Sequence, residues 1–147
     1  SILAGDEAWE SRVVAAYYRL SKVEERIREE PQAVAPHFEE RNREFHLALI
    51  SACPSAWLHR IYAMLYQQSE RYRRVAVINR TRSRDVHAEH KAIFEAVLAR
   101  DVERARGLIG EHIDRTLTVL REVLARPETT SAANDKARPV RDKTGPK

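Results

Sequence analysis

Apolar side chains recur at helical spacing along most of the chain, and this pattern limits the possible folds more than any other feature. Near the start, Trp9, Val13, Ala16 and Leu20 follow one another at intervals of three or four residues. That spacing places the four side chains on one face of an α-helix. Because no strand-like alternation and no Asn-Gly hairpin signal competes with it, the sequence predicts an all-α fold.

Residues that start and stop helices divide the pattern into about five to six segments. Ser55 and Asp101 are predicted N-caps, and Pro54 is predicted to end the helix before it. The sequence SKVE at 21–24 fits a capping box, which predicts a short restarted helix that Pro31 ends. The long helices are predicted at about 6–20, 37–53, 55–79, 83–99 and 102–126. Such segments are typical of an antiparallel helical bundle.

The third and fifth long segments carry apolar stripes that we expect to face the core of the bundle. In the third segment the stripe consists of Leu58, Ile61, Leu65, Tyr72 and Val75. In the fifth it consists of Leu108, Ile109, Ile113, Leu117, Leu120 and Leu124. A helix of a soluble bundle buries such a stripe and leaves its polar face in water.

Length and composition fit one domain followed by a tail. The 147 residues suffice for a single core, which we assign to residues 1–126, whereas 127–147 has few large apolar side chains and is expected to be disordered. The tail holds five basic and three acidic residues, so it supplies half of the net charge of +4. The bundle itself is therefore only mildly basic, which is weak support for direct nucleic-acid binding.

Several signals concern the location of the protein. The longest apolar run, VVAAYY at 13–18, is too short to span a bilayer, and the N-terminus has no signal-peptide pattern. Cys53 is the single cysteine, so no internal disulfide can form. These features predict a cytoplasmic protein without membrane contact. Because the chain begins with Ser1 rather than Met, we also expect it to be part of a longer protein.

Three histidines stand at the inward edges of three different helices. His46 precedes Leu49, His90 precedes Ile93, and His112 lies between apolar neighbours, while Asn42 is one helical turn before His46. A single histidine on a half-buried face usually makes only a hydrogen bond. Three uncoordinated imidazoles buried together are costly, however, because each needs partners and none can readily charge. Together they predict a site for zinc, nickel, copper, iron or cobalt.

The surrounding residues resemble a known family. The stretches NREFHLALISAC (42–53), WLHRIYAMLYQQSERYRR (57–74), EHKAIFEAVLARDVERA (89–105) and EHIDRTL (111–117) are similar to the effector-binding FCD domain of GntR-family bacterial transcription regulators. The histidine separations of 44 and 22 residues also fit that pattern. The resemblance implies that Asn42, His46, His90 and His112 hold a divalent metal, commonly zinc or nickel, at the base of a cavity in the bundle core.

One residue departs from the family pattern. Asn42 stands where aspartate is more familiar. An amide oxygen is neutral and ligates more weakly than a carboxylate, so the site has one negative charge fewer. We therefore expect a more electropositive metal that favours an anionic ligand in an open position.

An arginine-rich stretch, RYRRVAVINRTRSR at 71–84, supplies candidates for binding such an anion. Most of its six arginines are expected on a solvated helix face, with a nucleic-acid stripe as the alternative. Arginine binds a carboxylate through two parallel hydrogen bonds, and the resemblance places RYR along the pocket wall. Arg71 and Arg73 lie on opposite flanks of the apolar stripe, so at most one is expected to reach the cavity easily.

The predicted effector-binding residues are therefore Gln68, Arg71, Tyr72, Arg73 and His87. His87 shares a face with His90 and either lines the cavity or stays at the solvent edge, while His37 and His59 are expected on the surface.

These observations predict a sensor rather than an enzyme. The metal would bind a small carboxylate metabolite and shift a homodimer between two arrangements. In the family, DNA is read by an N-terminal winged helix-turn-helix domain, which this chain lacks, and the first helix of the effector domain is also expected upstream. The alternatives are a helical-bundle metalloenzyme acting on a small carboxylate and a purely structural dimer. Against the enzyme, Glu89 and Glu111 each precede a histidine and point roughly 100° away from it on a helix.

Overall fold

A computed structural model describes residues 1–27, 31–79 and 84–125, and these residues form five helices and no strand. The helices are α1 (Glu7–Ile27), α2 (Pro31–Ile50), α3 (Ala56–Asn79), α4 (Val86–Leu98) and α5 (Val102–Ala125). The predicted all-α bundle is confirmed. None of the described helices combines the length and apolarity required to cross a membrane. The predicted tail at 127–147 lies outside the described residues.

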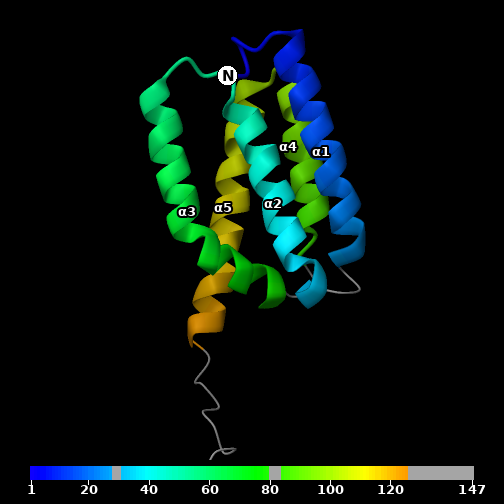
Figure 1. Cartoon of the computed structure of the whole chain (residues 1–147), viewed down its shortest axis with the longest axis vertical. Helices are drawn as coiled ribbons and strands as arrows, with labels where there is room; N and C mark the ends of the chain where they lie inside the picture. The colour runs from blue at the N-terminus through cyan, green and yellow to red at the C-terminus, as the bar shows by residue number, and fades with distance from the viewer. Residues whose placement is uncertain (28–30, 80–83, 126–147) are drawn as a thin grey trace, which may run out of the picture.

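Successive helices run in opposite directions, as the colour gradient of Figure 1 shows. Helix α1 packs against α2 and α4, and α5 packs against α4 and α3. Helix α3 stands at one side of the bundle, where α2 and α5 cover its inner face (Figure 1). The interior is therefore built mainly from α1, α2, α4 and α5.

The predicted stripe of α1 forms one wall of the main core. Trp9, Val13 and Leu20 are fully buried, and the Trp9 indole Nε1–H donates a hydrogen bond of 2.9 Å to the Ala48 carbonyl on α2. Apolar side chains from three further helices complete this core, namely Phe38, Phe45, Leu49, Ile93, Ala96, Val97 and Ala105. Burial of this apolar surface is the main force that holds the helices together.

The predicted N-caps are confirmed. The Leu58 N–H donates to Ser55 Oγ at 3.3 Å before α3, and the Arg104 N–H donates to Asp101 Oδ1 at 3.0 Å before α5. Each cap satisfies a backbone donor that the first helical turn leaves without an internal partner.

The prediction for residues 21–31 is wrong. Helix α1 continues without a break to Ile27, and Pro31 begins α2 instead of ending a short helix. The Ser21 hydroxyl, expected as an N-cap, donates to the Tyr18 carbonyl at 2.9 Å and so tolerates a position inside a helix. Proline suits the first turn of a helix, where its missing N–H has no intrahelical acceptor to lose.

The stripes of α3 and α5 are less buried than predicted. Leu58 and Leu65 are both 58% exposed, and Ile113 is 52% exposed. Leu58 and Leu65 belong to α3, which stands at the side of the bundle (Figure 1), whereas Ile113 belongs to α5. The other exposed members of the two stripes are Ile61, Tyr72, Leu117 and Leu124.

Gly5 is predicted to be essential for stability, because a Cβ atom at this position would lie 2.2 Å from Trp9 Cε3. Gly5→Ala should therefore lower the free energy of unfolding by about 1–3 kcal/mol, the usual cost of overpacking a core. The matched control is Gly107→Ala, where the new Cβ meets nothing within 4 Å. Since Gly107 lies inside α5, this control should gain about 0.5–1 kcal/mol. Urea unfolding of both variants measures the difference, and equal stability for Gly5→Ala and wild type would contradict it.

Candidate metal centre

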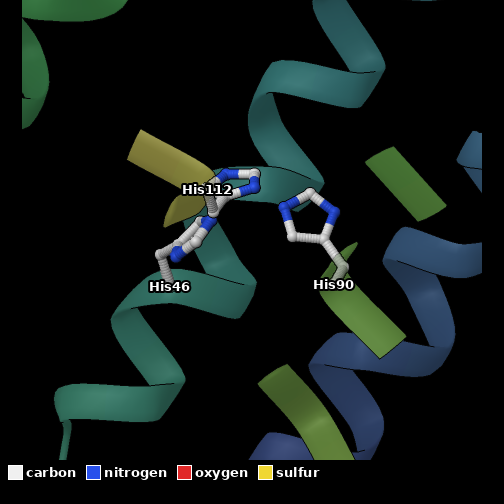
Figure 2. Close-up of side chains that lie close together, drawn as sticks. All are labelled: His46, His90 and His112. Carbon is white, nitrogen blue, oxygen red and sulfur yellow. The ribbon is translucent and has the colours of Figure 1, made fainter. Parts of the chain in front are cut away.

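Three histidines from three helices converge in the bundle. His46 lies on α2, His90 on α4 and His112 on α5, and their rings face a common space (Figure 2). A nitrogen of each ring lies within 4.8 Å of a nitrogen of each of the others. The ring centroids are 5.4 Å apart for His46 and His90, and 4.7 Å apart for His90 and His112. We call His46, His90 and His112 the histidine cluster.

His90 is held by a buried carboxylate. Its Nδ1 lies 2.6 Å from Glu24 Oε1 on α1, and both side chains are almost completely buried. A carboxylate accepts hydrogen bonds, so the imidazole proton belongs on Nδ1. The other nitrogen, Nε2, then carries a lone pair, and it is buried without a hydrogen-bond partner. This arrangement is the usual one for histidines that bind metals.

His112 has the same kind of support. Its Nδ1 lies 2.8 Å from Glu89 Oε2, and Glu89 also forms two hydrogen bonds with the Arg84 guanidinium. Burial alone would raise the pKa of Glu89, but the hydrogen bonds from His112 and Arg84 hold it well below its usual range. Burial lowers the pKa of His112, although Glu89 opposes this shift. The Glu89 carboxylate thereby fixes Nδ1 of His112, and Nε2 lies on the other side of the ring.

His46 is kept neutral by its surroundings. Burial lowers its pKa well below the usual value, and the nearby His90 and His112 add to this effect. A neutral imidazole has the lone pair that metal binding requires. The pKa shift therefore favours the form of His46 that can ligate.

Asn42, one helical turn before His46 on α2, has a side-chain oxygen that could serve as a further donor. The side chain is buried, and its Nδ2 donates to the Tyr66 hydroxyl at 2.9 Å. Its Oδ1 is buried without a hydrogen-bond partner. An unpartnered buried oxygen costs about 1–3 kcal/mol, and a metal ion would remove that cost. The donor set of three imidazoles and one amide oxygen fits a divalent transition metal.

Of the predicted effector-binding residues, one on α3 turns toward the bundle. Arg73 Nε donates to Glu39 Oε1 at 2.9 Å, and its guanidinium lies 3.5 Å above the Tyr66 ring. Gln68, Arg71 and Tyr72 are exposed. Arg71 and Arg73 thus differ in exposure, and which of them reaches an effector cavity stays a prediction.

His87 is at the solvent edge and still connected to the cluster. Its side chain is 37% exposed, and its Nδ1 lies 2.8 Å from Glu24 Oε2. Glu24 thus bridges His87 and His90. Of the other two histidines, His37 is exposed and His59 is half-buried against the Cys53 carbonyl.

Sequence reasoning missed the supporting carboxylates Glu24, Glu89 and Glu39. Glu24 follows Leu20 by four residues and continues the buried stripe of α1, which was a usable signal. The sequence predicts only that Glu89 points away from His90, and in the structure its carboxylate contacts His112 on α5. Only the packing of α4 against α5 reveals that contact.

Comparison with known families places the chain in one of them. Residues 3–115 match the FCD domain, so the chain belongs to the FCD family. This confirms the resemblance found in the sequence. The FCD domain is a regulatory, effector-binding domain and not a catalytic one, which supports the expectation of a sensor over a metalloenzyme.

Two similar proteins are named as transcription regulators. One is the uncharacterised HTH-type transcriptional regulator BphR of Paraburkholderia xenovorans (strain LB400), 46% identical over 83% of this chain and 50% of its own length. The other is the HTH-type transcriptional repressor GlaR of Escherichia coli (strain K12), 29% identical over 85% of this chain and 58% of its own length. The chain thus spans little more than half of these relatives. No solved structure matches it.

Glu24→Gln is predicted to weaken metal binding while the fold persists. Glutamine keeps the shape and can still accept from Nδ1, but it removes the negative charge that makes His90 a better ligand. Loss of such a partner typically lowers metal affinity by about 10–100-fold. Competition with a chelator for Zn²⁺ measures the change, and the neighbouring exposed Glu25→Gln is the control. Equal affinities for the two variants would contradict a role for Glu24.

Proposed function

We propose that this chain is the metal-dependent, ligand-sensing part of a transcription regulator. Asn42, His46, His90 and His112 hold a divalent ion, for which zinc and nickel are the leading candidates. When bound, the ion supplies an electrophilic centre with an open position for a carboxylate oxygen of a small metabolite. The domain signals because the metabolite binds one of two arrangements more tightly.

The observation that carries this proposal is the pair of unpartnered buried atoms, His90 Nε2 and Asn42 Oδ1. Both carry lone pairs, and both belong to residues at or beside the histidine cluster. Buried polar atoms normally have partners. A bound cation satisfies both of them at once, and it also explains why three neutral imidazoles are gathered in one place.

The charges around the site support an anionic effector. All four proposed ligands are neutral, and the nearest supporting carboxylates, Glu24 and Glu89, contact the far nitrogens of His90 and His112. The charge of the ion is therefore not neutralised by its direct ligands. A carboxylate in the open position would supply the missing negative charge.

Arg73 is the strongest candidate among the effector-binding residues. It is half-buried, and its guanidinium lies over the ring of Tyr66, which accepts a hydrogen bond from the proposed ligand Asn42. Its Nε and Nη2 donate to Glu39 Oε1, and its Nη1 donates to the Ser69 hydroxyl. These bonds use three of the five guanidinium N–H donors, so a carboxylate of the effector could share this guanidinium. Gln68, Arg71, Tyr72 and His87 remain weaker candidates, because they are more exposed.

The proposed partners follow from the relatives. Their names as HTH-type regulators support DNA binding through a winged helix-turn-helix domain outside this chain and a cytoplasmic location. The uncovered apolar side chains of α3, such as Trp57 and Leu58, support a homodimer, because large exposed apolar patches mark interaction sites. A dimer also suits the reading of palindromic DNA.

A small carboxylate is predicted to stabilise the protein only in its metal-bound form. Purified protein is analysed for bound metal, and its thermal unfolding is followed with a panel of small carboxylic acids before and after chelation. At about 100 times its dissociation constant, the correct acid should add about 2.7 kcal/mol of stability by mass action. Chelation should abolish that gain.

Three variants serve as internal checks. His90→Ala and His112→Ala should lose both the metal and the response to the acid, whereas His37→Ala, an exposed change on α2, should keep both. Native protein without metal, together with unchanged behaviour of His90→Ala, would contradict the metal site. Turnover of the stabilising acid would contradict the sensor and favour the metalloenzyme.

A further inference from the structure

We infer that Tyr66 and Glu39 are positioning residues that orient the Asn42 amide so that its oxygen, and not its NH₂ group, faces the histidine cluster. This inference rests on the proposed metal site and adds a requirement specific to this chain. It concerns residues on α2 and α3 that do not themselves ligate the ion.

The orientation of an asparagine amide decides whether it can bind a metal. Its two ends have nearly the same shape, but only the carbonyl oxygen has lone pairs to offer. Rotation of Asn42 by half a turn would direct two N–H donors toward the space that a cation occupies. A carboxylate has no such requirement, because its two oxygens are equivalent. The asparagine therefore needs a device that distinguishes its two ends.

Tyr66 is the side chain that touches the other end of the amide. The Asn42 Nδ2 donates to the Tyr66 hydroxyl oxygen at 2.9 Å, while Oδ1 is left without a partner. A hydroxyl can accept and donate, so Tyr66 alone would stabilise either orientation of the amide. The direction of the hydroxyl proton must be set by a second group.

Glu39 supplies that second group. Its Oε2 is buried with no hydrogen-bond partner, and the Arg73 guanidinium that binds its Oε1 lies over the Tyr66 ring, so we assign Oε2 as the acceptor for the Tyr66 proton. Burial raises the pKa of Glu39, whereas the bound Arg73 guanidinium opposes this shift and favours the charged form of the carboxyl, which only accepts hydrogen bonds. The Tyr66 proton is thus drawn toward Glu39, and the hydroxyl oxygen remains free to accept from Asn42.

The result is a series of hydrogen bonds that begins at the charged Arg73 and ends at the proposed ligand Asn42. Arg73 donates to Glu39, Glu39 attracts the Tyr66 proton, and Tyr66 accepts from the Asn42 NH₂ group. The amide oxygen is then left without a hydrogen-bond partner, on a residue one helical turn before His46 on α2. Linked hydrogen bonds of this kind strengthen one another in a buried environment.

The test compares Tyr66→Phe in two backgrounds, wild type and Asn42→Asp. Phenylalanine fills the same space but removes the hydroxyl. Affinity for Co²⁺ is measured by visible absorption in competition with a chelator, which reports ligation directly. In the asparagine background we expect Tyr66→Phe to weaken binding about 10–100-fold, the usual effect of losing a ligand's supporting partner. In the aspartate background, where no orientation is needed, we expect a loss of less than about 3-fold.

Circular dichroism shows whether Tyr66→Phe folds, and a second variant tests the inference if it does not. Glu39→Gln offers an NH₂ group to Tyr66, so the hydroxyl donates to Asn42 instead, and Co²⁺ binding should weaken only in the asparagine background. Equal losses in both backgrounds, or no loss in either, would overturn the inference while leaving the metal site intact. Wild-type protein that binds no Co²⁺ would overturn the metal proposal and this inference with it.

Discussion

The hydrogen bond between His90 and Glu24 is the interaction on which the rest of the site depends. A carboxylate and an imidazole buried this completely would be costly apart, since each loses its contact with water. Together they join α4 to α1 and determine which nitrogen of His90 carries the proton. The free nitrogen faces α2 and α5, which bring the other two histidines (Figure 2). The hydrogen bond between His90 and Glu24 therefore serves both the packing of α4 on α1 and the protonation state of the site.

A second histidine of the cluster is also paired with a carboxylate through its Nδ1. Glu89 holds His112 as Glu24 holds His90, and Arg84 in turn holds Glu89. Asn42 is supported by Tyr66 instead of a carboxylate. In the proposed metal site the direct donors are neutral, and the carboxylates contact the donors and not the ion. A cation held in this way would keep enough positive charge to attract a further anion.

Much of the fold could be predicted from the sequence, because helix formation and the position of the apolar face on each helix are set by local sequence. Trp9 and Leu20 identify the buried face of α1, and Ser55 and Asp101 are correctly placed as caps. The resemblance to the FCD domain, which the histidine separations fit, gives the correct family. Contacts between helices are not local. Glu89 reaches His112 only through the packing of α4 on α5, and no periodicity within α4 contains that information.

The two errors in the fold have different physical causes. At residues 21–31, a capping box and a proline are ambiguous signals, because serine can bond back within a helix and proline can begin one. On α3, the apolar stripe was read correctly, but its burial depends on what lies beside it. Leu58 and Leu65 are apolar at helical spacing and remain exposed in the five-helix bundle. An apolar stripe predicts that one face of a helix is suited to burial, but it does not identify the element that packs against that face.

The distribution of the histidine cluster along the chain has a consequence for the order of assembly. Asn42 and His46 are one turn apart on the same helix, but His90 lies 44 residues beyond His46 and His112 a further 22 beyond His90. Loops of this length must close before three nitrogens can reach one ion, and closing them costs entropy that the packing of the helices must first supply. If the proposed metal site is occupied, uptake of the ion should therefore follow the collapse of the bundle instead of nucleating it. Loss of the ion should in turn require helices to separate, so the rate of metal loss would report how fast the domain opens.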